Sequence, residues 1–286
     1  MEKQKTLFDI IEEESTIFRD REVFQTYYTP EILKYRTNEL ETMAFYSRKV
    51  KRGFAPNNME IKGPNSTGKT TTVKKYLQLI QETYENIIGV TVNCQIHRTE
   101  YTIFTEIYKK IFNKKTQNNT LSTINIYDEI MTYITEKNKI LIVALDDYDS
   151  IKNNIELNRT LYTLLRAHET YENAKISVIT ISKPRKSIIM NLDINTIFLP
   201  MTIYFPTYTR SQIHDILQQR VNLGFYKGVV SNEYLEKLTD RTYNSGNIRE
   251  GIKKLLTDGE KAEYHGKKKI WENHSCKKNS PLEFLF

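Results

Sequence analysis

The sequence has few cysteines and no long apolar run. Its 286 residues include two cysteines, Cys94 and Cys276, which lie far apart in the chain and give no disulfide framework, so we expect a reducing compartment. The uninterrupted apolar stretches are only as long as a strand, as at 140–145, and the N-terminus is acidic. We therefore expect a soluble cytoplasmic protein without a membrane partner, in which Cys94 is a small buried residue.

The charge balance is basic and uneven along the chain. The formal net charge is +7 and the sequence pI is about 9.1, with a lysine run at 267–269 and a glutamate run at 12–14. A basic balance favours a nucleic-acid partner, although it also occurs in proteins that use charge only for solubility. The hydrophobic content of 39% is sufficient for a full-sized core, and the length allows one large domain plus a small one.

A phosphate-binding loop is the most specific motif in the sequence. Gly63, Gly68, Lys69 and Thr70 match G-x-x-x-x-G-K-[ST], a pattern expected by chance in on the order of one per cent of chains of this length. A short strand can precede the loop, and a helix with apolar residues on one side can follow it. Strand, loop and helix in this order are the context that the motif requires.

Each residue type in this loop has a role with phosphate. Glycines let the backbone N–H groups wrap the phosphates, and the helix N-terminus adds its positive end. Lys69 is predicted to reach the outer phosphates during catalysis, and Thr70 to offer its hydroxyl to Mg²⁺. The predicted nucleotide contacts in the loop are Gly63, Pro64, Asn65, Ser66, Thr67, Gly68, Lys69, Thr70 and Thr71.

A second segment supplies the acidic groups that such a site needs. Six apolar residues at 140–145 precede Asp146 and Asp147, which is typical of a central strand in a parallel sheet. Because ligands bind at the carboxyl ends of such strands, Asp146 is predicted to support Mg²⁺ and Asp147 to position the attacking water. The alternative is that these acids only cap the turn after the strand.

Further motifs follow one another in a family-specific order. They are "YYTPEILKYRTNELETMAFYSRKV", "GPNSTGKT", "VNC", "LDDYDSI", "LYTLLR", "FPTYTRSQIHDILQQR" and "SGNIRE". Over roughly 27–263, the chain resembles the archaeal replication initiators of the origin-recognition and cell-division-control type, a branch of the AAA+ ATPases. The resemblance implies ATP or ADP with Mg²⁺ as ligands. It also implies an α/β fold, in which a P-loop AAA+ core with a parallel sheet is followed by a small all-α lid.

The lid is also predicted by apolar periodicity. Two stripes at helical spacing, the first ending at Gly224, indicate packed helices; their members are Ile213, Ile216, Leu217 and Val221, then Ile248, Ile252, Leu255 and Leu256. The predicted organisation is an N-terminal segment at 1–24, a nucleotide-binding core at 25–204, a helical lid at 205–265 and a basic tail at 266–286.

The resemblance assigns further residues to the nucleotide. Tyr28, Pro30 and Arg36 occupy the places of the family segment that precedes the core and touches the adenine. Arg249 matches the second sensor arginine, which approaches the outer phosphate and lets the lid respond to ATP or ADP. Without the resemblance, Arg249 would be read as an ordinary exposed arginine.

The chain also departs from the family pattern at the expected catalytic positions. Asp147 stands where the family has glutamate, and Ser182 with Lys183 replaces the first sensor asparagine; Lys183 is predicted either to touch the outer phosphate or to turn into solvent. A misplacement of about 1 Å can reduce a rate roughly a hundredfold. Slow hydrolysis is therefore expected.

Two expected elements of the family have no counterpart in the sequence. No arginine occurs between Arg185 and Arg210, so a finger for a neighbouring subunit is missing unless Arg159, Arg166 or Arg185 replaces it. The chain also ends soon after the predicted lid, which leaves too few residues for the family's DNA-binding winged helix. DNA contact is then expected from the core, its helical insertion within 97–123, and the basic tail.

Both termini contain short apolar patterns. Gln4, Leu7, Ile10 and Ile11 have the spacing of the peptide with which archaeal replication proteins bind the sliding clamp, although an ordinary amphipathic helix gives the same spacing. The C-terminal segment, with Leu282, Phe284 and Phe286, is a weaker version that is expected to dock on this chain or on a partner.

These observations predict an ATP/ADP switch in DNA replication initiation, of the origin-recognition or helicase-loading type, or in a related plasmid or viral process. Double-stranded DNA is the expected partner, with a sliding clamp, a helicase or a second copy of the chain as further candidates, in a nucleoid-associated cytoplasmic location. One alternative is a non-hydrolysing, nucleotide-bound adaptor of replication proteins. Another is a clamp-loader-like or transposition-regulator ATPase.

Overall fold

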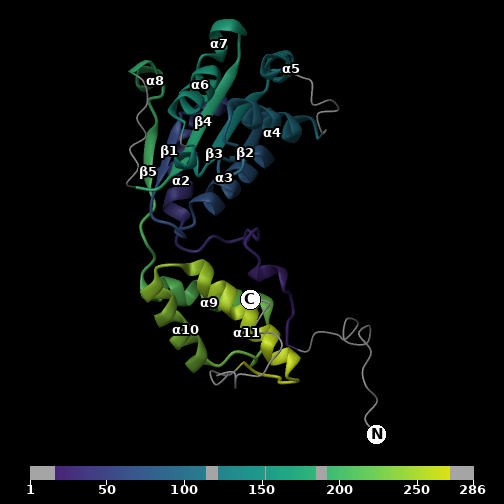
Figure 1. Ribbon diagram of the computed structural model, residues 1–286, viewed down its shortest axis with the longest axis vertical. Coiled ribbons are helices and arrows are strands. Elements are labelled where there is room, and N and C mark those ends of the chain that lie inside the picture. Colours follow the sequence, from purple (N-terminus) through teal and green to yellow (C-terminus); the bar gives the residue numbers. More distant parts are fainter. Residues whose placement is uncertain (1–16, 114–121, 152, 185–191, 271–286) are drawn as a thin grey trace. The chain divides into compact units, whose positions relative to one another are not determined.

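The computed structural model describes residues 17–113, 122–151, 153–184 and 192–270. These residues form two compact units, one from Glu31 to Thr207 and one that combines 17–30 with 208–270 (Figure 1). The divisions at 30/31 and 207/208 lie near the predicted divisions at 24/25 and 204/205. The clamp-type peptide, the apolar C-terminal residues and Arg185 lie outside the described residues.

The first unit is built on a five-stranded parallel sheet. Its spatial order is β2-β3-β4-β1-β5, and every neighbouring pair is parallel. The predicted α/β fold with a parallel sheet is therefore confirmed. The strands are β1 (Met59–Lys62), β2 (Ile87–Asn93), β3 (Ile140–Asp146), β4 (Lys175–Ser182) and β5 (Met201–Tyr204).

Strand β3 is central because its residues are apolar on both faces. All seven residues from Ile140 to Asp146 are buried. Successive side chains of a strand point to opposite faces, so Leu141, Val143 and Leu145 join one apolar cluster while Ile140, Ile142 and Ala144 join another. Helices must therefore cover both faces of the sheet, as in a three-layer α/β domain.

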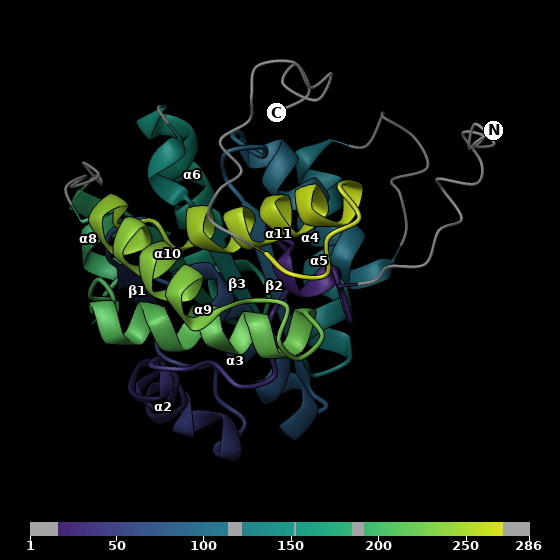
Figure 2. The ribbon, with the colours of Figure 1, turned by 90° about the horizontal axis from the view of Figure 1, so that it is seen from below.

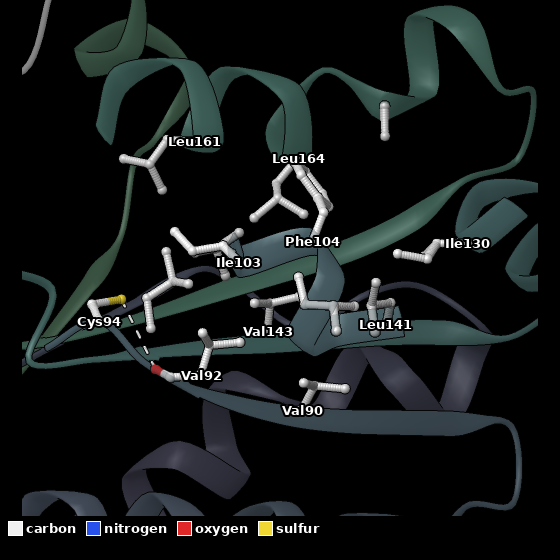
Figure 3. Packing of buried hydrophobic residues seen from close by; sticks show 14 of the residues in the cluster. Val90, Val92, Cys94, Ile103, Phe104, Ile130, Leu141, Val143, Leu161 and Leu164 are labelled. Atoms are coloured by element: carbon white, nitrogen blue, oxygen red, sulfur yellow. Dashed lines mark hydrogen bonds between the residues drawn. The ribbon is translucent and has the colours of Figure 1, made fainter. Parts of the chain in front are cut away.

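Helices of the first unit supply those covers. On one face, Ile103 and Phe104 of α4 and Leu161 of α6 pack over β2 and β3, together with the fully buried Cys94 (Figure 3), whose predicted burial is confirmed. On the other face, α2 contributes Met43, and α3 contributes Val73, Leu77 and Ile80. The helices are α2 (Thr37–Tyr46), α3 (Lys69–Thr83), α4 (Glu100–Phe112), α5 (Thr123–Glu136), α6 (Asn154–Leu165), α7 (Ala167–Thr170) and α8 (Leu192–Ile197), with 3-10 helices η2 (Arg48–Arg52) and η3 (Tyr148–Ser150).

The second unit is helical, as predicted for the lid. It contains η1 (Glu22–Phe24), α9 (Arg210–Gly224), α10 (Asn232–Ser245) and α11 (Ile248–Tyr264), seen from below in Figure 2. Seven of the eight predicted stripe residues join its core, where Leu217 and Leu255 are fully buried; the exception is the half-buried Ile216. None of the helices within the described residues is both long and apolar enough to cross a membrane.

Residues 17–24 pack on the helical unit through aromatic rings. The rings of Phe18 and Phe24 each lie 4.8 Å from the ring of Phe225. Glycines make room for them: a Cβ on Gly224 would meet Phe24 at 2.3 Å, and a Cβ on Gly259 would meet Phe18 at 2.4 Å. Gly224 does end α9, as predicted, but close approach of an aromatic ring, not a left-handed backbone, requires glycine there.

The substitution Gly259→Ala tests this packing. In an exposed helix it would gain about 1 kcal/mol from helix propensity, but overpacking against Phe18 costs about 1–3 kcal/mol. We expect a net loss of stability, measured by urea unfolding followed by circular dichroism. In the Phe18→Leu background the loss should be smaller, since the ring that meets the new methyl group is gone. A stabilised Gly259→Ala protein would show that Phe18 does not pack there.

Candidate nucleotide-binding site

The carboxyl ends of four strands meet at one edge of the sheet. Lys62 of β1 is level with Ser182 of β4, and Asn93 of β2 is level with Asp146 of β3. The phosphate loop leaves β1 directly after Lys62. The parallel register therefore brings the loop and the acidic end of β3 to the same edge, as predicted from the sequence.

The phosphate loop has the backbone shape that its glycines allow. Gly63 lies against the backbone of Phe205, where a Cβ would meet the carbonyl oxygen at 2.4 Å. Ser66 (φ 59°) and Gly68 (φ 86°) adopt left-handed conformations, which bend the chain so that backbone N–H groups line a concave turn. The hydroxyl of Thr67 closes the turn by donating to the carbonyl of Pro64 at 2.9 Å, while Asn65 is exposed and Thr71 is half-buried.

Lys69 is the first residue of α3 and its side chain folds back over the loop. Its ammonium group donates to the carbonyl oxygens of Gly63 at 2.7 Å and Pro64 at 2.6 Å, and only 8% of the residue is exposed. A buried ammonium needs such acceptors, because an unpaired buried charge is strongly destabilised. The side chain thus lies inside the loop, where it can contact a phosphate group.

Thr70 and Asp146, the two predicted magnesium ligands, lie side by side. The Thr70 hydroxyl donates to Oδ1 of Asp146 at 3.0 Å. Asp146 is 8% exposed, and burial raises the pKa of its carboxyl group, with the Thr70 hydrogen bond opposing this shift. A buried carboxylate with a raised pKa favours a cation beside it, and hydroxyl plus carboxylate oxygens suit Mg²⁺.

Asp147 is held by a residue that sequence reasoning missed. The amide of Gln95 donates to Oδ2 of Asp147 at 2.8 Å, and the backbone N–H of Asp147 donates to Oδ1 of Asp146 at 3.1 Å. Asp147 has a left-handed backbone (φ 49°), which aspartate tolerates better than most residues. Gln95 follows β2 by two residues, and only its place near the end of a strand could have pointed to it.

The sensor and finger candidates do not all reach this edge. Lys183 follows the buried Ser182 and is exposed, so both predicted orientations of its side chain stay open. Arg166 donates to Glu169 at 2.5 Å and stacks on Tyr162, whereas Arg159 is exposed beside Glu100 at 3.9 Å. Of these two arginines, only Arg159 keeps its guanidinium largely in solvent.

Three residues assigned by resemblance fall in different units. Tyr28 belongs to the helical unit, where the guanidinium of Arg220 lies 4.6 Å from the centre of its ring. Arg249 is exposed in the first turn of α11, after the cap formed by Asn247. Arg36 belongs to the core unit and donates to the backbone carbonyl of Thr67 in the phosphate loop at 2.8 Å. This contact was not predicted.

Family models match both units. A model of the Cdc6 AAA+ ATPase-type lid domain matches residues 214–277, and a model of the NB-ARC domain matches residues 45–169. The second match covers the phosphate loop and β3.

Solved structures share the fold. The Aeropyrum pernix ORC1 protein, solved in complex with DNA, is 22% identical, with a TM-score of 0.79 over 91% of this chain and 69% of that chain. The Aeropyrum pernix ORC2 protein, solved as ADPNP-ADP complexes, is 24% identical, with a TM-score of 0.76 over 90% of this chain and 70% of that chain. The chain thus shares the fold of these two proteins, and the match to the Cdc6 AAA+ lid model agrees with an AAA+ fold.

Sequence relatives identify the family. ORC1-type DNA replication protein 2 of Methanothermobacter thermautotrophicus is 35% identical over 288 residues, which cover 99% of this chain and 76% of the relative. ORC1-type DNA replication protein 6 of Halobacterium salinarum is 35% identical over 258 residues, which cover 89% of this chain and 69% of the relative. With a phosphate loop, an acidic strand end and a helical lid in the family's order, the chain belongs to the archaeal ORC1-type DNA replication proteins.

Proposed function

We propose that this protein is an ATP/ADP switch that engages double-stranded DNA during replication initiation and hydrolyses ATP slowly. The observation that carries the proposal is the meeting of Lys69 and Thr70 with Asp146 and Asp147 at one edge of the sheet, in a chain of the ORC1 type. A triphosphate and Mg²⁺ fit this edge, since a buried ammonium and backbone N–H groups face phosphate while a buried carboxylate faces a cation.

The proposed roles follow from these positions. Lys69 contacts the outer phosphates, Thr70 and Asp146 hold Mg²⁺, and Asp147 orients the water. When bound, Mg²⁺ supplies positive charge to the phosphate oxygens. Tyr28 and Arg249 are proposed to contact the nucleotide on the strength of the family resemblance. The half-exposed Tyr28 ring and the exposed Arg249 guanidinium of the helical unit leave both available for this.

Slow hydrolysis is supported by the position of Asp147. The Asp147 side chain is shorter than a glutamate side chain by one methylene group, and its carboxylate accepts a hydrogen bond from the Gln95 amide. A base that orients water must be within hydrogen-bond reach of that water, so the water must use an acceptor position of the Asp147 carboxylate that Gln95 leaves open. Slow hydrolysis would keep the bound nucleotide in its ATP form for longer, as a conformational switch requires.

A basic, aromatic surface of the core unit suits DNA phosphates. Four cations lie on or beside the short helix η2, no acid occurs between Glu41 and Glu60, and Phe45 and Phe54 are 55% and 61% exposed. In the described part of the chain, none of the four forms an ion pair. They are Arg48, Lys49, Lys51 and Arg52, all exposed. Such unpaired charges release counterions when they meet a polyanion.

The remaining partners stay predictions. The clamp-type peptide falls outside the described residues, and a helicase or a second copy of the chain would have to be sought by binding experiments. A nucleotide-bound adaptor shares every feature of the nucleotide site and differs in having no nucleotide-dependent affinity for DNA. The experiments below separate it from the switch.

The main test measures DNA binding as a function of nucleotide. A labelled duplex is titrated with the protein by fluorescence anisotropy with ATP, with ADP and without nucleotide, across a salt series. We expect an affinity that differs between nucleotides and falls steeply with salt. In Lys69→Ala the nucleotide dependence should disappear, because the ammonium contact with the phosphates is gone. Weak, nucleotide-independent binding by the unmodified protein would reject the switch and favour the adaptor.

The basic surface is tested by removing three of its charges. In Lys49→Ala/Lys51→Ala/Arg52→Ala the duplex affinity should fall about tenfold or more, and the slope of log K against log salt should become shallower by up to about 3. The matched control is Lys137→Ala/Lys227→Ala/Lys253→Ala, which removes three exposed charges from elsewhere. An equal loss in both variants would show only a general charge effect, and no loss in either would place DNA contact on other residues.

The metal role is tested by Asp146→Asn. The amide oxygen can still accept from Thr70 and from the backbone of Asp147, but no charge is buried. Because burial raises the pKa of Asp146, its ionised form is disfavoured in the folded protein, so at neutral pH the variant should melt a few degrees higher in EDTA, or about 1 kcal/mol. This difference should shrink as the pH falls, since the wild-type carboxyl group then binds a proton.

The same variant should lose the extra stabilisation that Mg²⁺ adds to ATP in thermal melting. Asp240→Asn is the control, because Asp240 is exposed and its pKa is lowered by Arg210, so its removal should not raise the melting temperature. If Asp146→Asn melts no higher than wild type and keeps the full Mg²⁺ effect, Asp146 is not a metal ligand.

A further inference from the structure

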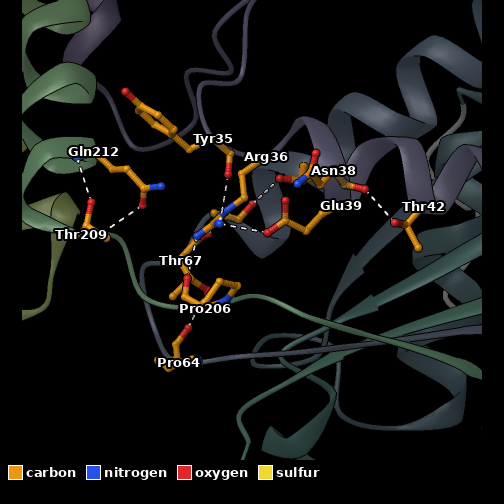
Figure 4. A network of polar contacts seen from close by, with 12 residues as sticks. Tyr35, Arg36, Asn38, Glu39, Thr42, Pro64, Thr67, Pro206, Thr209 and Gln212 are labelled. Carbon is orange, nitrogen blue, oxygen red and sulfur yellow. Dashed lines mark hydrogen bonds and ion pairs between the residues drawn. The ribbon is translucent and has the colours of Figure 1, made fainter.

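Arg36 is a buried arginine whose guanidinium group contacts three separate segments of the core unit. It directly precedes α2 and is 4% exposed. Its Nε donates to the Thr67 carbonyl at 2.8 Å and its Nη2 donates to the Pro206 carbonyl at 2.7 Å. Its Nη1 donates to the Tyr35 carbonyl at 3.1 Å and to the Glu39 carboxylate at 2.9 Å (Figure 4).

These contacts do more than neutralise a buried charge. The Glu39 carboxylate supplies an opposite charge, while Nε and Nη2 of the planar guanidinium group donate to main-chain carbonyls of two distant segments and Nη1 donates to the carbonyl of the adjacent Tyr35. The backbone of Tyr35 is left-handed (φ 62°), an unfavourable conformation for a bulky residue. The bond from Nη1 to its carbonyl helps to hold that conformation, so the guanidinium fixes the shape of the backbone around it.

The contact with Thr67 determines the orientation of one peptide of the phosphate loop. In a trans peptide the C=O and N–H bonds point to opposite sides, and the described residues contain no cis peptide bond. Arg36 holds the Thr67 carbonyl on the α2 side, so the N–H of Gly68 points away from α2. That N–H belongs to the turn formed by the left-handed Ser66 and Gly68.

The contact with Pro206 joins the same peptide to the exit of β5. Phe205, which precedes Pro206, donates its N–H to the Lys62 carbonyl at 2.7 Å, and its backbone packs against Gly63. The exit of β5 is thus fastened to the beginning of the loop by Phe205 and to the end of the loop by Arg36. A change in the Thr67–Gly68 peptide must alter the geometry of Arg36 or of the Pro206 carbonyl.

We propose that Arg36 is a positioning residue for the nucleotide phosphates: it holds the Thr67 carbonyl outside the loop, so that the Gly68 N–H faces the β-phosphate, and it ties this peptide to the exit of β5. The proposal rests on the proposed nucleotide function of the same site. It assigns to Arg36 a role through the backbone, without contact to the nucleotide.

The first test removes the planar guanidinium group of Arg36 and keeps its positive charge. Arg36→Lys is compared with wild type by isothermal titration with ADP and by ³¹P NMR of ADP at saturation. Lysine cannot reach three carbonyls in one plane, so we expect about 10- to 100-fold weaker binding. The bound β-phosphate resonance should also move towards that of free ADP. A loss of folding stability alone would not move this resonance in a saturated protein.

Two control variants separate the effect of the guanidinium hydrogen bonds from the effect of charge. Arg241→Lys makes the same change at an exposed arginine of α10, and Glu39→Gln removes the counter-charge while leaving the three carbonyl contacts. Both should bind ADP within about threefold of wild type with an unchanged ³¹P spectrum. If Arg36→Lys also shows wild-type affinity and an unchanged resonance, Arg36 only anchors the core and the proposal is wrong.

A measurement on the wild-type protein covers the case in which Arg36→Lys does not fold. The Nε–H of Arg36, buried against the Thr67 carbonyl, is followed by ¹⁵N NMR while ADP is added. Its resonance should shift with the same midpoint as the ADP-binding curve. A resonance that stays constant at saturation would overturn the proposal. Absence of ADP binding by the wild-type protein would instead reject the proposed function itself.

Discussion

The parallel register of the sheet is the constraint on which the site depends. Because β2, β3, β4 and β1 run in one direction, their carboxyl ends lie at the same edge, and each end contributes something different. Strand β1 leads into the phosphate loop, β3 ends in two acids, β2 is followed by Gln95, and β4 ends at Ser182 before Lys183. The four strand ends are far apart in sequence, so loss of register at one strand would disperse the site.

The edge concentrates negative charge in a poorly hydrated place. Burial is the main cause that raises the pKa of the Cys94 thiol, and the carboxylates of Asp146, Asp147 and Asp149 raise it further, so the three acids lie close to one buried group. The buried ammonium group of Lys69 donates to carbonyl oxygens of the loop. A nucleotide with Mg²⁺ would rebalance this arrangement, because the cation faces the acids and the phosphates face Lys69. Ligand binding should therefore favour the fold as well as the function.

The sequence predicted those features that depend on local pattern. The loop motif, the six apolar residues before Asp146 and the stripes of α9 and α11 are each carried by consecutive or periodic residues, so no tertiary information was needed. Contacts between distant segments could not be predicted. The pairing of Gln95 with Asp147 spans 52 positions, and that of Arg36 with Pro206 spans 170. The need for glycine at 224 and 259 likewise could not be predicted, because it comes from the rings of Phe24 and Phe18 that pack against these positions.

The chain passes twice between its two units, at 30/31 and at 207/208, because residues 17–30 pack with the helices that follow the core. Arg36 lies six residues after Pro30, where the first division falls. Its guanidinium group donates to the carbonyl of Pro206, one residue before Thr207, where the second division falls. Both connections are thus close in sequence to a contact of Arg36, whose guanidinium group also donates a hydrogen bond to the phosphate loop. In a switch of the proposed kind, the two covalent connections can carry a change in the state of the loop. The guanidinium group of Arg36 links the phosphate loop to the segments of the core unit that lead into the two connections.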